Sequence, residues 1–156
     1  IAFANLNNGN AYTDTQNTVL TTSTNAYRGY EIRTYITTLP TSPELDVISL
    51  FNGGTYPSPD EWLAGDNGYG YTSNDTTISG VNLFNSTPCD GGGNPPCFAP
   101  FSLSAPGDIV ADHTDLVVGA PVSNENFIVT HRVTVSPTQT AATYQTEVIY
   151  TATVRY

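Results

Sequence analysis

The sequence contains no lysine and no methionine, and only two histidines and two cysteines among its 156 residues. Without lysine the chain cannot form side-chain isopeptide bonds, a lysine Schiff base or a lysine-containing phosphate loop. One pair of cysteines cannot supply the four ligands of a CxxC-type metal site. No stretch approaches the roughly 20 apolar residues of a membrane span. We therefore expect no catalytic residue, no metal, no cofactor and no membrane insertion.

Charge is also scarce and one-sided. Charged residues make up 12% of the chain, and four arginines stand against fourteen acids, which gives a formal net charge of −10. Nucleic acid and anionic lipid surfaces would repel this chain, so neither is an expected partner. The length and the lack of a linker predict one domain over residues 1–156. Because the sequence begins at Ile1, we expect either a removed leader or a longer parent chain.

The sequence is rich in β-strand signal. From residue 142 to 156, apolar and aromatic side chains share one parity with the exception of Ile149, which predicts one long, half-buried strand. Short turn-forming segments separate further strands, and residues 25–29 form a connection of hairpin size. These strands are predicted over residues 1–6, 18–24, 30–37, 68–73, 78–84, 98–103 and 126–135. The pattern predicts an all-β fold, an antiparallel β-sandwich of about seven or more strands.

The two longest strands predict part of the core. Their apolar residues fall on matching parity, so one side of each strand should be buried. The predicted buried residues are Phe127, Val129, Val133, Val148, Tyr150 and Val154.

One short helical turn is expected after residue 57. Ser58 fits an N-cap, Pro59 fits the first helical position and Glu61 completes a capping box. Trp62 then lies on the apolar face of that turn, where burial is favoured over exposure as a platform for sugars, and Gly65 ends the turn.

Cys89 and Cys97 lie in a loop of Gly, Pro and Asn. We expect a local disulfide, with two free thiols as the alternative. A disulfide indicates an oxidising compartment outside the cytoplasm.

Candidate catalytic residues are few. His131 has an inward position on its strand, which favours a packed or hydrogen-bonded imidazole, and His113 lies in an Asp-rich turn expected to be solvated. No serine has the surroundings of a nucleophile elbow. Asp60 and Glu61 are adjacent, and a capping role explains them better than a glycosidase pair.

Two kinds of surface site remain open. Asp108, Asp112 and Asp115 have the ligand chemistry for Ca²⁺ but lack the EF-hand spacing, so a solvated acidic loop is favoured. Asn74 and Asn85 both begin Asn-X-Thr triplets and are candidate glycosylation sites, although such triplets also arise by chance in a chain rich in Asn and Thr.

Several motifs occur together in a recognisable order. They are FxNLxxG with Phe3, Asn5, Leu6 and Gly9, STNAYRGYEI at 23–32, Trp62 followed by GYGYTSND at 68–75, and TYQTEVIYTATVRY at 143–156. Their order and spacing resemble secreted Ig-like β-sandwich modules of bacterial surface proteins and pilin-like filament subunits. The resemblance touches most of the chain, and its motifs are turns, strand edges and core aromatics. It implies an extracellular, cell-surface Ig-like sandwich, and a role in assembly or adhesion only by analogy.

We therefore expect a non-enzymatic structural subunit of an extracellular filament or surface layer, with copies of itself as partners. Within residues 1–10, Ile1, Phe3 and Leu6 form a short uncharged segment suited to strand addition on a neighbouring subunit.

The alternative is an adhesive or carbohydrate-binding module with surface glycans as partners. It would use a shallow groove lined by Tyr56, Tyr69 or Tyr71, next to Asn67 or Asp66. A third interpretation is a spacer domain within a longer surface protein.

Overall fold

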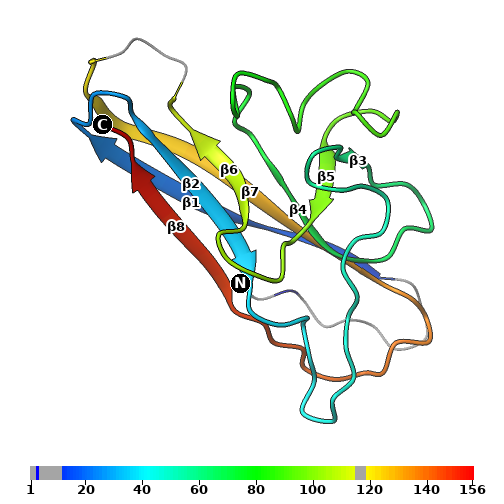
Figure 1. Ribbon diagram of the computed structural model, residues 1–156. Helices are drawn as coiled ribbons and strands as arrows, with labels where there is room; N and C mark the ends of the chain where they lie inside the picture. Colours follow the sequence, from blue (N-terminus) through cyan, green and yellow to red (C-terminus); the bar gives the residue numbers. More distant parts are fainter. Residues whose placement is uncertain (1–2, 4–11, 115–118) are drawn as a thin grey trace.

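The described part of the chain forms strands and loops, without a helix, in a computed structural model (Figure 1). It comprises residue 3 and residues 12–114 and 119–156. The eight strands are β1 Tyr12–Thr24, β2 Tyr30–Ile36, β3 Asp60–Glu61, β4 Gly68–Ser73, β5 Cys97–Pro100, β6 Asp108–Asp112, β7 Val122–Val135 and β8 Val148–Val154.

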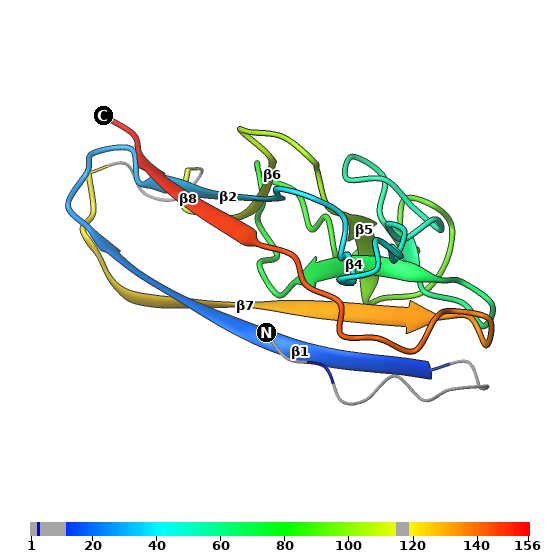
Figure 2. The same cartoon turned by 90° about the horizontal axis from the view of Figure 1, so that it is seen from below.

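The strands form two sheets that pack face to face (Figure 2). The larger sheet has five strands in the order β1-β7-β4-β5-β3, and the smaller has three in the order β6-β2-β8. All pairs of neighbouring strands are antiparallel. The predicted all-β class is confirmed, and the two stacked antiparallel sheets fit the layers of a sandwich.

The interior lies between the sheets because each long strand alternates buried and exposed side chains. In β7, Phe127, Val129, His131 and Val133 face inward and are buried, while Ile128 on the other face is exposed. The burial predicted for Phe127, Val129 and Val133 is confirmed. Tyr71, Phe84 and Phe101 extend the same core from β4 and the loops, and none is more than 2% exposed.

Strand β7 connects the larger sheet. It pairs with β1 from Tyr12↔Val135 to Thr24↔Val122, with one register shift between Thr22 and Thr24. On its other side it pairs with β4 from Gly68↔Thr134 to Ser73↔Val129. The strands predicted at 30–37, 68–73 and 126–135 therefore correspond to observed strands with small changes in their ends.

The connection between β1 and β2 does not make a hairpin. Its length fits a hairpin, but β1 pairs with β7 in one sheet and β2 pairs with β6 and β8 in the other. The chain therefore crosses between the sheets. Gly29 makes this crossing with φ of 73°, and a side chain there would collide with the carbonyl of His113.

The predicted helical turn is absent, which corrects the expectation for residues 58–65. Asp60 and Glu61 instead form strand β3 and pair with Phe98 and Cys97 of β5. The capping residues have another use here: the Asp60 and Glu61 carboxylates accept backbone N–H groups at 93 and 94 of the disulfide loop. Hydrogen bonds to a loop distant in sequence have thus outweighed the local preference for a helical turn.

Two other strand predictions were too generous. Residues 78–84 make only an isolated bridge between Ile78 and Val81, and the chain turns there through positive φ at Ser79 and Gly80. The C-terminal strand begins at Val148 rather than at 142. Val148 and Tyr150 are half-buried, and Val154 is 43% exposed, so the predicted burial of Val154 was wrong. The reason is that β8 is the last strand of the smaller sheet.

Substitution of Val133 should cost more stability than substitution of Val148, because only Val133 is enclosed on all sides. We expect Val133→Ala to lower the free energy of unfolding by about 1–3 kcal/mol through the cavity it leaves, and Val148→Ala to lower it by about half as much. Denaturant unfolding of both variants measures the difference. Equal losses, or a larger loss for Val148→Ala, would show that the β8 side of the interior is as tightly packed as the β7 side.

Candidate functional site

His131 joins the two sheets from the middle of the core. Its side chain is fully buried, and its Nδ1 lies 2.9 Å from the Tyr69 hydroxyl. Its Nε2 lies 3.2 Å from the Thr18 hydroxyl on β1 and 2.9 Å from the Tyr150 hydroxyl on β8. The predicted packed, hydrogen-bonded imidazole is confirmed. Burial lowers the pKa of His131 to about 4, so the imidazole is neutral at pH 7.

His113 is not the solvated residue that the sequence predicted. Its Nδ1 lies 3.0 Å from Oε2 of Glu125, and its ring stacks on Tyr30 with 6.2 Å between the centroids. The Tyr30 hydroxyl donates to the same carboxylate at 2.6 Å. Glu125 thus collects two donors and fixes the start of β7 against β2. The arrangement is a structural contact between the sheets.

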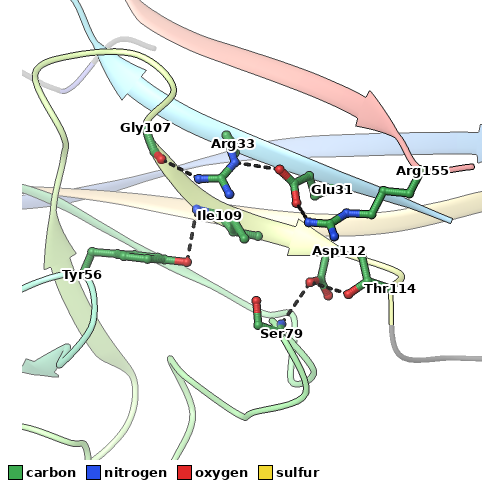
Figure 3. Close-up of polar contacts among 9 residues, drawn as sticks. All are labelled: Glu31, Arg33, Tyr56, Ser79, Gly107, Ile109, Asp112, Thr114 and Arg155. Carbon is green, nitrogen blue, oxygen red and sulfur yellow. Dashed lines mark hydrogen bonds and ion pairs between the residues drawn. The ribbon is translucent and has the colours of Figure 1, made fainter. Parts of the chain in front are cut away.

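The acidic segment is hydrogen-bonded rather than solvated, which corrects the expectation for two of its members. Asp112 is buried, and its Oδ2 accepts the Ser79 N–H and the Thr114 hydroxyl, both at 3.0 Å (Figure 3). Asp108 accepts the Tyr71 hydroxyl at 3.3 Å. Asp115 lies outside the described residues. Within the described residues no group of three or more His, Cys, Asp or Glu side chains could hold a metal ion.

The Cys89–Cys97 disulfide is present, as predicted. Its loop is held against β3, since Gly93 N–H donates to Asp60 Oδ1 at 3.0 Å and Asn94 N–H donates to Glu61 Oε2 at 2.8 Å. Cys89 and Cys97 are both buried. The bridge and these hydrogen bonds make one ordered end of the larger sheet.

The two glycosylation candidates differ in accessibility. Asn74 is exposed, and its Oδ1 accepts the Ile128 N–H at 2.7 Å. Asn85 is half-buried, and its Nδ2, the atom that would carry a glycan, donates to the Ser73 carbonyl at 3.1 Å. The geometry is compatible with modification at Asn74 and unfavourable at Asn85.

The tyrosines proposed for a carbohydrate groove are part of the interior. Tyr69 is 3% exposed and Tyr71 is fully buried, while the half-buried Tyr56 accepts the Ile109 N–H at 3.2 Å. The rings of Tyr69 and Tyr71 are therefore too buried to stack on a sugar.

Trp62 is also a packing residue, as predicted. It stacks on Phe51 at 4.2 Å and meets Phe98 edge-on at 5.4 Å between ring centroids. The Arg132 guanidinium lies 4.8 Å from the Trp62 ring centroid and covers this second cluster. Trp62 is only 6% exposed, so it offers no open platform.

The edges of the two sheets are the feature that packing does not explain. Each sheet has two edge strands, and an edge strand carries a row of main-chain donors and acceptors without a strand partner. On one side of the molecule lie β3, β5 and β6, and on the opposite side lie β1 and β8 (Figure 1). The strand edges are capped on the first side and lack a strand partner on the second.

The side with β6 and β3 is closed. Along β6, the Tyr56 hydroxyl accepts the Ile109 N–H, and the Ser73 hydroxyl donates to the Val110 carbonyl at 2.5 Å (Figure 3 shows the first contact). The Asp75 carboxylate accepts the Asp112 N–H at 2.8 Å. Strand β3 has two residues and is covered by the disulfide loop. Short strands and side-chain caps of this kind block further pairing.

The side with β1 and β8 is open in the described part of the chain. Strand β1 has 13 residues and pairs only with β7, and β8 has seven residues and pairs only with β2. Neither contains proline, and Asp14 is the only charged residue in the two strands. Asp14 Oδ1 accepts one edge donor, the Thr15 N–H, at 2.8 Å. We identify this open side, defined by the free edges of β1 and β8, as the candidate functional site.

The main-chain groups that point away from the partner strands of β1 and β8 can be deduced from the neighbouring hydrogen bonds. The Thr37 N–H donates to the Glu147 carbonyl, and the Arg155 N–H donates to the Gly29 carbonyl. The main-chain groups of odd-numbered residues in β8 therefore point toward β2, and those of even-numbered residues point away from it. In the larger sheet the main chain of Tyr69 on β4 bonds to residues 49 and 51, so the even-numbered residues of β4 are the ones that bond to β7. The register of β7 with β4 and with β1 then places the N–H and C=O groups of the odd-numbered residues of β1 on the side away from β7. The outward main-chain positions are Val148, Tyr150, Ala152 and Val154 in β8 and Thr13, Thr15, Asn17, Val19 and Thr21 in β1.

An ion-pair network secures the end of β8 on its inner edge. Glu31 on β2 binds Arg33 at 2.7 Å and also binds Arg155, which follows β8 (Figure 3). Burial alone would raise the pKa of Glu31, but hydrogen bonds from Arg155 and Arg33 outweigh it and hold the pKa below its usual value. Arg155 thus fastens the end of β8 to β2, while Arg33 holds the Glu31 carboxylate in place from within β2. The strand β8 itself carries no charged side chain.

Of the predicted assembly strand, only Phe3 belongs to the described residues. Phe3 is half-buried against the core and meets Tyr69 edge-on, with 6.0 Å between the ring centroids. Ile1 and Leu6 lie outside the described residues. Phe3 therefore packs against the core of its own subunit.

Comparison with known proteins gave no match to a family model, to a curated protein or to a solved structure. Among the described residues no helix is long and apolar enough to cross a membrane. The candidate site thus depends on the geometry of this chain alone.

Acid should weaken the fold through His131. The unfolded chain takes up a proton near pH 6.5, but the folded protein resists it until about pH 4. The stability due to the neutral imidazole is therefore present above pH 6.5 and is lost between pH 6.5 and 4, by about 3 kcal/mol in total. His131→Gln removes this part of the pH dependence.

The measurement is denaturant unfolding at several pH values for both proteins. The partners Tyr69, Tyr150 and Thr18, and carboxylates such as Glu31 and Asp108, are present in both, so the difference between the two curves isolates the imidazole. Parallel curves across this window would contradict the assignment of His131 as a buried neutral group.

Proposed function

We propose that this protein is a non-enzymatic structural subunit of an extracellular filament or surface layer, with an Ig-like sandwich that assembles through strand-mediated contacts between copies. The observation that carries the proposal is the open side, where the edges of β1 and β8 have no strand partner among the described residues, while the opposite side is capped by side chains and a disulfide loop. Natural sheets usually protect long edges, and an unprotected one is suited to pairing with another chain.

Electrostatics favour contact through this side. Subunits with a formal charge of −10 repel one another, so a stable contact between copies needs surfaces that are locally neutral. Strands β1 and β8 together carry one charged side chain. Main-chain hydrogen bonds supply affinity there without any need for opposite charges.

Two further observations support an extracellular structural role. The Cys89–Cys97 disulfide suits an oxidising compartment. The residues that most often carry catalysis have packing roles: His131 is enclosed by Tyr69, Tyr150 and Thr18, and His113 is paired with Glu125. The aromatic residues of the adhesive alternative are likewise engaged in the interior, so we favour assembly over carbohydrate binding.

The first residues of the chain are the proposed donor. Ile1, Phe3 and Leu6 belong to an uncharged segment followed by Asn8-Gly9, a sequence that permits a sharp turn. Phe3 already packs beside Tyr69 in its own subunit. An exchange in which the segment of one copy docks on the next would replace that internal contact by an equivalent external one, so little stability is lost on assembly.

Deletion of residues 1–6 should abolish polymerisation and leave a folded monomer that still has an acceptor. Added in small amounts to the full chain, this monomer should cap growing ends and shorten filaments. Electron microscopy and sedimentation velocity measure both effects. Normal filaments from the deleted protein would show that the N-terminal segment is not the donor.

Phe3→Ala is the matched control for this deletion, because it keeps the main chain of the segment and removes only the ring. We expect shorter or fewer filaments rather than none, with a modest fall in thermal midpoint from the lost Tyr69 contact. A large fall in midpoint for the deleted protein would instead assign the segment to the fold of its own subunit.

A further inference from the structure

A tight turn after β2 exposes a leucine in a conformation that suits glycine. The Ser42 N–H donates to the Asp46 carbonyl at 2.8 Å, and the Leu45 N–H donates to the Ser42 carbonyl at 3.0 Å, so the turn is ordered. Leu45 has φ of 70°, in the left-handed region, and its side chain is 79% exposed. The residue therefore strains the backbone without adding packing to the interior, which points to a contact outside the subunit.

This turn lies at one end of the ladder that β2 forms with β8. Thr41 bridges to Gln145 just before β8 and also to Val47 across the turn. Glu44 is exposed beside Leu45, and Val47 is 46% exposed. We call this surface the acidic tip, which consists of Glu44, Leu45, Asp46 and Val47.

The other end of the same ladder carries the opposite charge. Beyond the start of β2, the Arg28 N–H donates to the Arg155 carbonyl at 3.1 Å, and the Gly119 N–H donates to the Tyr27 carbonyl at 2.7 Å. These bonds hold an exposed arginine beside a tyrosine that is 61% exposed. Among the described residues Arg28 forms no ion pair. We call Tyr27 and Arg28 the basic corner.

Charge complementarity makes a second copy the fitting partner of both surfaces. Three of the four arginines are engaged within the subunit, two with Glu31 and one over Trp62, which leaves Arg28 as the exposed arginine. In Figure 1 the β1–β2 connection lies at the upper left and the turn after β2 at the lower edge, so the two surfaces cannot meet within one subunit. Copies placed one after another along the strands bring opposite charges together, although whole subunits repel one another.

We propose that the acidic tip of one copy packs against the basic corner of the next, with Leu45 on the Tyr27 ring and Glu44 paired with Arg28. The two surfaces differ, so the contact is heterologous and does not close at a dimer. This inference rests on the proposed association between copies but uses neither free strand edge. The contact is small, so we expect it to be weak alone and effective where strand contacts already hold copies together.

Disulfide trapping tests the contact without requiring filaments. Leu45→Cys in one protein and Tyr27→Cys in another place a thiol on each surface, while Cys89 and Cys97 are buried in their own bridge. Mixed with the oxidant diamide, the two proteins should form a cross-linked heterodimer roughly tenfold faster than a control mixture, because a specific contact raises the effective concentration of the thiols. The control mixture replaces Leu45→Cys with Leu63→Cys, at an exposed leucine near β3 and outside both surfaces.

Charge reversal tests the pairing of Glu44 with Arg28 in the same assay. Arg28→Glu in the Tyr27→Cys protein should slow trapping toward the control rate. Glu44→Arg added to the Leu45→Cys partner should then restore most of the rate, because the two signs are exchanged. High salt should slow trapping of the original pair, since both charged groups are exposed. Trapping that responds to neither reversal nor salt would overturn the charge pairing.

Leu45→Gly separates association from folding. Glycine suits φ of 70°, so the thermal midpoint should not fall, whereas the full chain should form shorter filaments. Leu63→Ala is the control and should leave filament length unchanged. A clear fall in the midpoint of Leu45→Gly would assign this leucine to the fold of its own subunit and overturn the inference.

The outcomes separate this contact from the proposed function. Trapping no faster than in the control mixture, with normal filaments from the wild-type chain, would overturn the end contact and leave the structural-subunit proposal standing. A wild-type chain that stays monomeric at every concentration and pH at which it is folded would overturn the proposed function. Fast, charge-dependent trapping in that same chain would still support the end contact.

Discussion

Unpaired main-chain groups at sheet edges are the constraint on which this architecture depends. Two stacked sheets of five and three strands have four edges, and each edge must be short, capped, paired or left available. Here Tyr56, Ser73 and Asp75 cap β6, and the disulfide loop covers the two-residue strand β3. Much of the polar chemistry that looks functional in the sequence is used for this purpose, and within the described residues the edges of β1 and β8 are left available.

Contacts in the interior keep the subunit folded although the edges of β1 and β8 have no strand partner. Strand β7 is paired along both sides, and His131 at its centre is bonded to hydroxyls on β1, β4 and β8. A buried imidazole with every polar atom satisfied fixes the relative position of both sheets, because any slip would leave a buried group unpaired. The Glu31–Arg155 pair holds the end of β8 against β2, on the edge of β8 that faces its partner strand. The open side is thus built from strands that are firmly held on their inner edges.

Much of the local structure was predictable from the sequence, whereas the pairing of the strands was not. Alternation identified β7, turn-forming segments delimited β4, and the short Cys89–Cys97 loop indicated its disulfide, because these signals involve neighbouring residues. The prediction of a helical turn was wrong because the carboxylates of Asp60 and Glu61 accept hydrogen bonds from a loop more than 30 residues away. Asp112 and His113 looked solvated for the same reason, since their partners Ser79 and Glu125 are distant in sequence. The open side could not be predicted at all, because it depends on the order of strands in both sheets.

The position of both free edges on one side also limits the kinds of assembly that this fold supports. Two copies that meet through the same surface are related by a two-fold axis, and such a contact closes at a dimer. A polymer requires the donor and the acceptor to be different parts of the chain, so that each subunit keeps one of them free. The capped β6 edge removes the opposite side as an acceptor. An extended segment that docks on the open side of the next subunit meets this requirement, because it uses one surface of each subunit and leaves the subunit's own segment available for the next.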